Sequence, residues 1–191
     1  MTDYKTKIFL DGLTSDEIIN NIDDRISGYT FNPSLYKELG VKNYLVHSKN
    51  LVKLVGNKPI SLEVTGDDKD TIIRQSIILS ELGKNVYVKI PITFTDGNYT
   101  LEILRELVSN DVKINITAVF TIEQINEIIP IISNTKNIIS VFAGRLFDIG
   151  VDARVEMKNI SSFVHENSDC KVLWASPRMS YDFISANEAK C

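Results

Sequence analysis

The 191-residue sequence predicts an α/β fold, specifically a TIM-type (β/α)8 barrel, from three observations. Short apolar segments rich in β-branched residues alternate with amphipathic segments, which indicates a parallel sheet with helical crossovers. No glycine-rich phosphate loop of the Rossmann or Walker kind follows an apolar segment, which favours a barrel over a doubly wound nucleotide-binding fold. Polar side chains recur at the ends of the apolar segments, where barrel enzymes collect their functional residues.

Each element has its own local signal. Strands are expected where β-branched and apolar residues run together, at 7–11, 27–31, 60–64, 86–91, 114–120, 138–144 and 171–176. Apolar residues spaced three and four apart predict helices at 68–82, 98–109, 122–132 and 152–166, and a last helix at 181–189. Thr14, with Glu17 three residues later, forms a capping box that begins the first helix. No linker divides the chain, so residues 1–191 are expected to form one domain.

The elements stop short of a complete barrel. An eighth strand and a terminal helix should follow the helix at 181–189, and neither is present. We therefore expect a fragment or a naturally shortened copy of the barrel, with open edges on its first and seventh strands. If 191 residues are the entire product, reduced stability and loss of activity are expected.

Alternate residues of a barrel strand face the interior, and the others face the helices. The predicted interior set is largely polar: Phe9, Asp11, Thr30, Asn32, Ser61, Glu63, Tyr87, Lys89, Asn115, Thr117, Ser140, Phe142, Trp174 and Ser176. The predicted exterior set is branched and apolar: Ile8, Leu10, Leu62, Val64, Val86, Val88, Ile90, Ile116, Val141 and Leu173. Polar groups that converge inside a fold form either a hydrogen-bonded network or a functional site.

Lys89 is the most informative interior residue because it lies within an otherwise apolar strand. Burial of an ammonium group is costly unless the amine is paired or neutral. A desolvated lysine with a lowered pKa is a nucleophile toward carbonyl carbon and forms a Schiff base. The sequence therefore predicts carbonyl chemistry at Lys89.

Composition and charge exclude several classes of protein. The net charge of −4 argues against a nucleic-acid-binding surface, which is normally basic. No apolar run is long enough to span a bilayer, and the opening residues lack the apolar core of a secretion signal. Cys170 and Cys191 do not have metal-ligand spacing. We expect a cytoplasmic protein without a metal site, a nucleic-acid partner or a membrane partner.

Six short motifs occur in the order typical of the transaldolase family. They are Thr30-Phe31-Asn32-Pro33-Ser34, Glu63-Val64, Val88-Lys89-Ile90-Pro91, Asn115-Ile116-Thr117, Phe142-Ala143-Gly144-Arg145 and Ala175-Ser176-Pro177-Arg178. The resemblance covers essentially the whole chain and extends to Asp11 on the first strand. It implies a TIM barrel of the small transaldolase and fructose-6-phosphate aldolase branch, without metal or organic cofactor. It also implies a place in carbohydrate metabolism, in the pentose phosphate pathway.

The resemblance further implies a reaction and a set of roles. In that family a strand lysine forms a Schiff base with a ketose phosphate, the C3–C4 bond breaks, and a dihydroxyacetone unit passes to an aldose phosphate. Lys89 resembles that lysine, and Glu63 resembles the carboxylate that moves protons through a water. Asp11 resembles the acid–base group at the C4 hydroxyl, and Thr117 resembles the hydroxyl that holds the catalytic water. The implied substrate-binding residues are Asn32, Asn115, Ser140 and Ser176, and the implied phosphate-binding residues are Arg145 and Arg178.

Other interpretations of the same residues stay open. Asp11 can cap the following helix, Glu63 can simply neutralise Lys89, and the two arginines can be ordinary surface side chains. The chain can be an aldolase, a catalytically silent sugar-phosphate-binding remnant, or another barrel isomerase or synthase. Glu63 with Phe142 is the transaldolase combination, because fructose-6-phosphate aldolases of the same superfamily carry glutamine and tyrosine there.

The sequence departs from the family pattern at two motifs. Phe31 replaces the second threonine of the usual Thr-Thr-Asn-Pro, and residues 145–152 form a longer version of the usual Arg-Ile-Asp. The longer version resembles a branch of small transaldolase-like proteins and leaves the acceptor sugar open. Small members of the family form rings held partly by a terminal helix, so a homo-oligomer also stays open.

Overall fold

The computed structural model describes residues 5–12, 14–20 and 23–191. Its strands are β1 Ile8–Asp11, β2 Ile26–Phe31, β3 Ile60–Glu63, β4 Val86–Pro91, β5 Ile114–Val119, β6 Ile138–Val141 and β7 Lys171–Trp174. Its helices are α1 Ser15–Asn20, α2 Pro33–Glu38, α3 Tyr44–Val55, α4 Lys69–Ser80, α5 Leu101–Ser109, α6 Ile122–Ile132, α7 Ala143–Asp148, α8 Ala153–Asn167 and α9 Asp182–Glu188. The predicted alternation of strands and helices is confirmed.

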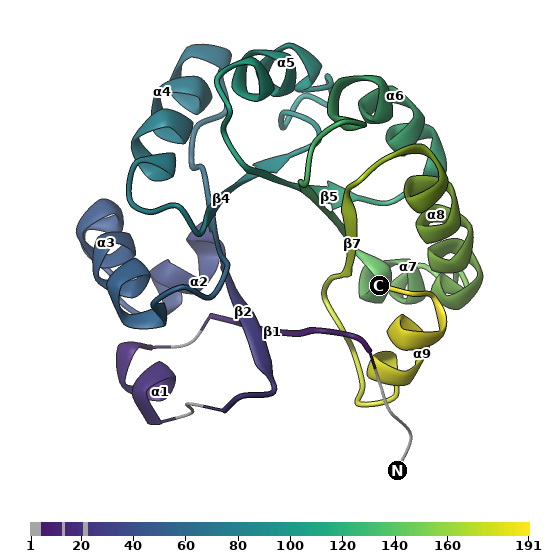
Figure 1. The fold of residues 1–191 in the computed structure, drawn as a ribbon, viewed down its shortest axis with the longest axis horizontal. Coiled ribbons are helices and arrows are strands. Elements are labelled where there is room, and N and C mark those ends of the chain that lie inside the picture. Colours follow the sequence, from purple (N-terminus) through teal and green to yellow (C-terminus); the bar gives the residue numbers. More distant parts are fainter. Residues whose placement is uncertain (1–4, 13, 21–22) are drawn as a thin grey trace.

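The strands form one parallel sheet in chain order from β1 to β7. The sheet is curled, and the helices form an outer arc around it (Figure 1). Within the described residues β1 and β7 are the two edges of the sheet, with no strand between them. The fold is therefore of the TIM-barrel type without its eighth strand, as the sequence predicts.

Side-chain caps explain where several helices begin. The Thr14 amide donates to Oε2 of Glu17 at 2.8 Å, and the Glu17 amide donates to Oγ1 of Thr14 at 3.2 Å. This confirms the predicted capping box of α1. Asn32 begins α2 in the same manner, because its Oδ1 accepts the Leu35 amide at 3.0 Å.

The main apolar core lies between the sheet and the helices. Leu62, Val88, Ile90 and Ile116 of the predicted exterior set are all 0% exposed. They belong to one cluster with buried residues of the helices, including Leu51, Leu104, Ile125 and Ile160. Because this layer provides the apolar burial, the interior of the curled sheet can carry polar side chains.

The predicted faces of β7 are wrong. Leu173 pairs in register with Ser140, and Trp174 pairs with Val141. Paired residues of neighbouring parallel strands point to the same side, so Leu173 shares the interior face of Ser140. The Trp174 ring instead meets the ring of Phe147 in α7, with 6.2 Å between centroids. Periodicity could not identify the faces because β7 is apolar at three successive positions.

β6 and β7 are shorter than predicted, ending at Val141 and Trp174. The chain turns directly into α7 after β6, and the loop after β7 packs against the start of that helix. A Cβ atom at Gly144 would lie 1.6 Å from the backbone oxygen of Ser176, so only glycine permits this approach. Ser176 itself has a φ of 57°. The contact positions the loop that carries Ser176 and Arg178.

We expect Gly144→Ala to destabilise the protein by about 1–3 kcal/mol, because the added methyl group meets backbone rather than a movable side chain. Urea unfolding followed by circular dichroism measures this change. Ser162→Ala, at an exposed position of α8, is the control and should change stability by less than about 0.5 kcal/mol. Equal stability of Gly144→Ala and the control would contradict the prediction.

Candidate active site

The centre of the site is an ion pair between neighbouring strands. Glu63 at the end of β3 pairs in register with Lys89 of β4. The Lys89 Nζ lies 3.0 Å from Oε2 of Glu63, and Lys89 is only 7% exposed. The structure therefore contains the buried ion pair that the sequence left open as an alternative. The same geometry also places a proton acceptor within hydrogen-bonding distance of the amine.

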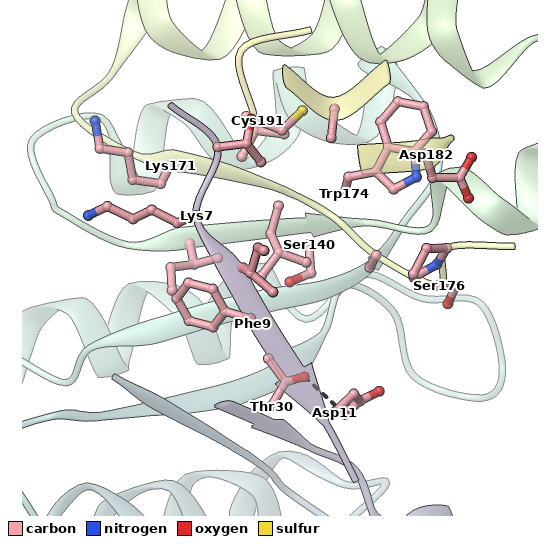
Figure 2. Close-up of a pocket in the computed structure, with 18 of the residues that line it drawn as sticks. Lys7, Phe9, Asp11, Thr30, Ser140, Lys171, Trp174, Ser176, Asp182 and Cys191 are labelled. Atoms are coloured by element: carbon pink, nitrogen blue, oxygen red, sulfur yellow. Dashed lines mark hydrogen bonds between the residues drawn. The ribbon is translucent and has the colours of Figure 1, made fainter. Parts of the chain in front are cut away.

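Asp11 approaches Lys89 from β1. The Thr30 hydroxyl donates to Oδ1 of Asp11 at 2.9 Å, as the dashed line in Figure 2 shows. Burial raises the pKa of Asp11, and the positive charge of Lys89 and the Thr30 hydrogen bond oppose this effect. Asp11 does not act as the cap of α1, since Thr14 has that role. Asp11 therefore lines the cavity as a solvent-exposed side chain, within electrostatic reach of the amine.

A chain of hydrogen bonds crosses the interior beside these charges. The Asn115 Nδ2 donates to Oγ of Ser61 at 3.0 Å, and the Ser140 hydroxyl donates to Oδ1 of Asn115 at 2.7 Å. All three side chains are buried. The two serines fix the orientation of the amide, so Asn115 has a structural task besides any contact with substrate.

Thr117 lies next to an irregularity in β5. The register between β5 and β6 shifts between Ile116 and Val119, and Ala118 has a φ of 57°. Such a bulge changes the direction of neighbouring side chains. The Thr117 hydroxyl is buried and is without a hydrogen-bond partner among the described residues. Buried hydroxyls are normally satisfied, so this one is suited to bind a ligand or a water.

A cavity of about 960 Å³ runs along the interior, past β1 and β7. Figure 2 shows Asp11 and Thr30 at one end of it, and Lys7 and Lys171 at the other. Among the described residues, six lysines and one arginine line it, against two aspartates. The predicted site residues in its wall are Asp11, Asn32, Lys89, Ser140, Arg145 and Ser176. Glu63, Asn115, Thr117 and Arg178 are outside this wall.

The two predicted phosphate-binding arginines differ in their surroundings. The Arg145 guanidinium lies over the ring of Phe142, 4.7 Å from its centroid, at the cavity wall. Arg178 is instead directed to Asp148, whose carboxylate accepts from its Nε at 2.9 Å and also from its Nη2. The structure therefore brings Arg145 to the cavity but not Arg178.

Sequence reasoning missed several residues that shape the site. Alternation predicts the interior face for Thr30 and Ser61 but indicates no role for them, and the structure shows that they hydrogen-bond to Asp11 and Asn115. The Tyr44 hydroxyl donates to the backbone oxygen of Glu63, a contact from α3 that no strand pattern indicates. Asp148 lies in the 145–152 segment that departs from the Arg-Ile-Asp motif of the family, and this departure is the signal in the sequence that could have drawn attention to it.

Two further observations concern the part of the chain that the structure describes. No three His, Cys, Asp or Glu side chains in it are grouped closely enough to hold a metal ion. None of its helices is both long and apolar enough to cross a bilayer.

Comparison with known proteins identifies the family. The family model described as transaldolase/fructose-6-phosphate aldolase matches residues 8–190. The chain belongs to this family. A probable transaldolase of Thermoanaerobacter sp. (strain X514) is 33% identical over 182 residues, which cover 94% of this chain and 80% of the relative. A probable transaldolase of Bartonella henselae is 30% identical over 175 residues, covering 90% and 76%. Membership in this family indicates an enzyme of the transaldolase or aldolase type. The polar interior of the curled sheet is the candidate site for that chemistry.

We expect Asp11→Asn to raise the melting temperature at pH 7. The folded protein holds the Asp11 proton more tightly than the unfolded chain, because burial raises the pKa. Ionisation therefore costs stability as the pH rises through the raised pKa, and asparagine removes that cost. The advantage should disappear below about pH 4, the ordinary aspartate range. Thermal unfolding at several pH values measures the difference.

Asp169→Asn, at an exposed position, is the control for the loss of one negative charge. It should not show the pH-dependent gain. A lower melting temperature for Asp11→Asn than for the unchanged protein at pH 7 would contradict the expectation.

Proposed function

We propose that this chain is a transaldolase-type transferase that moves a dihydroxyacetone unit between sugar phosphates through a Schiff base on Lys89. One observation carries the proposal: a buried lysine amine in a cavity wall, 3.0 Å from a carboxylate on the neighbouring strand. Membership in the transaldolase/fructose-6-phosphate aldolase family supports the general class of reaction. The lysine-dependent mechanism and the substrates are part of the proposal.

The first half of the proposed reaction joins the ketose to Lys89. The amine must lose a proton before its nitrogen attacks the carbonyl carbon, and Glu63 is the acceptor in contact with it. A C–N bond forms, and a proton moves from the nitrogen to the carbonyl oxygen, which becomes a hydroxyl group. That hydroxyl leaves as water after it receives a proton, which Glu63 supplies through a water held by Thr117. The product is a protonated imine.

The second half breaks the C3–C4 bond. The electron pair of that bond moves toward the positive imine, while the C4 hydroxyl gives its proton to Asp11. A raised pKa suits Asp11 to accept and later return this proton. The aldose leaves, and the remaining enamine attacks the aldehyde carbon of an acceptor sugar. Hydrolysis of the new imine then releases the product and restores Lys89.

The other site residues have binding roles in the proposal. Asn32, Ser140 and Ser176 line the cavity and bind sugar hydroxyls, and Asn115 orients Ser140 as well as contacting substrate. Arg145 with Arg178 binds the phosphate group.

A cytoplasmic location and a single domain belong to the same proposal. Cys170 and Cys191 are free thiols, which fits a reducing compartment.

Transfer is favoured over simple aldol cleavage by two residues at the site. Glu63 contacts the reacting amine, and Phe142 contacts both the Phe120 ring and the Arg145 guanidinium. Aldolases of the superfamily resemble this chain but carry glutamine and tyrosine at these positions. Transfer to erythrose 4-phosphate, measured with fructose 6-phosphate as donor, supports the transferase. Release of free dihydroxyacetone instead would support the aldolase.

Borohydride trapping tests the lysine. Reduction in the presence of fructose 6-phosphate should leave a covalent adduct on Lys89, because the imine becomes a stable secondary amine. Peptide mapping by mass spectrometry locates the adduct. Lys89→Met should give none, whereas Lys113→Met, a change of an exposed lysine at the start of the neighbouring strand, should leave it intact. No adduct on the unchanged protein would support the silent sugar-phosphate-binding remnant.

Glu63→Gln tests the proton-transfer role. We expect kcat to fall by about 10²- to 10⁴-fold, the usual contribution of general acid–base catalysis, with Lys89 still open to slow trapping. Steady-state kinetics with fructose 6-phosphate measures the loss. Unchanged kcat would mean that Glu63 only balances the charge of Lys89.

A further inference from the structure

The guanidinium of Arg178 is held by internal acceptors on both sides. Its Nε and Nη2 donate to the two carboxylate oxygens of Asp148, the first at 2.9 Å. Its Nη1 donates to the backbone oxygen of Ser176 at 3.3 Å. Arginine binds phosphate through the same kind of parallel pair of N–H groups. Asp148 therefore occupies the edge of Arg178 that is shaped to receive an anion.

The backbone at Arg178 is fixed, so only its side chain is free to change partner. The buried Asp182 carboxylate accepts the amides of Arg178 and Met179, at 2.5 and 3.2 Å. Gly144 also packs closely against the backbone of this loop, at Ser176. A move of the guanidinium to the cavity thus requires rotation of the side chain and release of Asp148.

The Asp148–Arg178 pair is suited to such an exchange. The two side chains are 50% and 39% exposed, and ion pairs in contact with water contribute little to stability. Asp148 is also three residues after Arg145 on α7. Hydrogen bonds from Arg178, together with the charges of Arg178 and Arg145, hold the pKa of Asp148 below its usual value. One carboxylate is thus within electrostatic reach of both proposed phosphate-binding arginines.

We propose that Asp148 is a positioning residue that competes with the substrate phosphate for Arg178. It holds the guanidinium away from the cavity wall, where Arg145 already lies, until a phosphate group takes its place. This inference rests on the phosphate-binding role given to Arg145 and Arg178 under the proposed function. It assigns the acid of the unusual 145–152 segment an effect on substrate affinity.

Asp148→Asn with inorganic phosphate as the probe tests the inference. Removal of the competing charge should tighten phosphate binding by about two- to fivefold, measured by isothermal titration calorimetry. The gain should vanish in the double variant Asp148→Asn with Arg178→Gln. In steady-state kinetics, Asp148→Asn should lower KM for fructose 6-phosphate and leave kcat unchanged, a split that a merely structural role would not produce.

Asp152→Asn is the matched control. Asp152 also pairs with an exposed arginine, since Nε and Nη2 of Arg154 donate to its two oxygens at 2.9 and 2.8 Å. Asparagine there keeps an oxygen to cap α8, and phosphate affinity should not change.

Unchanged or weaker phosphate binding by Asp148→Asn would overturn the inference, as would the absence of phosphate binding in every variant. Trapping with unphosphorylated dihydroxyacetone keeps this failure apart from that of the proposed function. That compound has no phosphate, so adduct formation on Lys89 should be the same with and without Asp148. An adduct without the phosphate effect would overturn only the role of Asp148, and no adduct would overturn the Schiff-base mechanism itself.

Discussion

The register between β3 and β4 is the constraint on which the site depends. Parallel pairing places Glu63 directly beside Lys89. Backbone hydrogen bonds between the two strands therefore bring the two charged side chains within contact distance. Shifting either strand by one residue would turn one charge toward the apolar helical layer. The cost of an unpaired charge in that layer opposes such a shift. The ion pair thus helps to specify the register that in turn holds it.

Much of the fold follows from patterns that are local in the sequence. Strands and helices with clear apolar periodicity, such as α6 at Ile122–Ile132, were predicted with their bounds. Lys89 could be singled out because one cation in an apolar strand is a strong physical signal. Alternation also predicts that Glu63 and Asp11 lie near Lys89. Both residues end a strand of the same parallel sheet and are predicted on its interior face.

The remaining features depend on contacts that alternation does not encode. The left-handed Ala118 shifts the register of β5 without any glycine or proline to mark it. The faces of β7 were reversed in the prediction because both of its candidate residues are large and apolar. Arg178 matched a phosphate-binding motif, yet its partner Asp148 is thirty residues away in sequence and on another element. Such a pairing becomes visible only when the loop after β7 is packed on α7.

The unequal lining of the cavity has a consequence for encounters in solution. The chain carries a net charge of −4, but seven basic side chains among the described residues line this cavity against two aspartates, and only Lys89 of the seven is paired with Glu63. A small anion is therefore repelled by the molecule as a whole and attracted by its hollow side, where low-dielectric walls concentrate the field. Its capture rate should depend steeply on ionic strength, because dissolved salt screens the attraction over roughly 10 Å. Diffusion toward this protein is consequently directed by a local field whose sign is opposite to that of the whole.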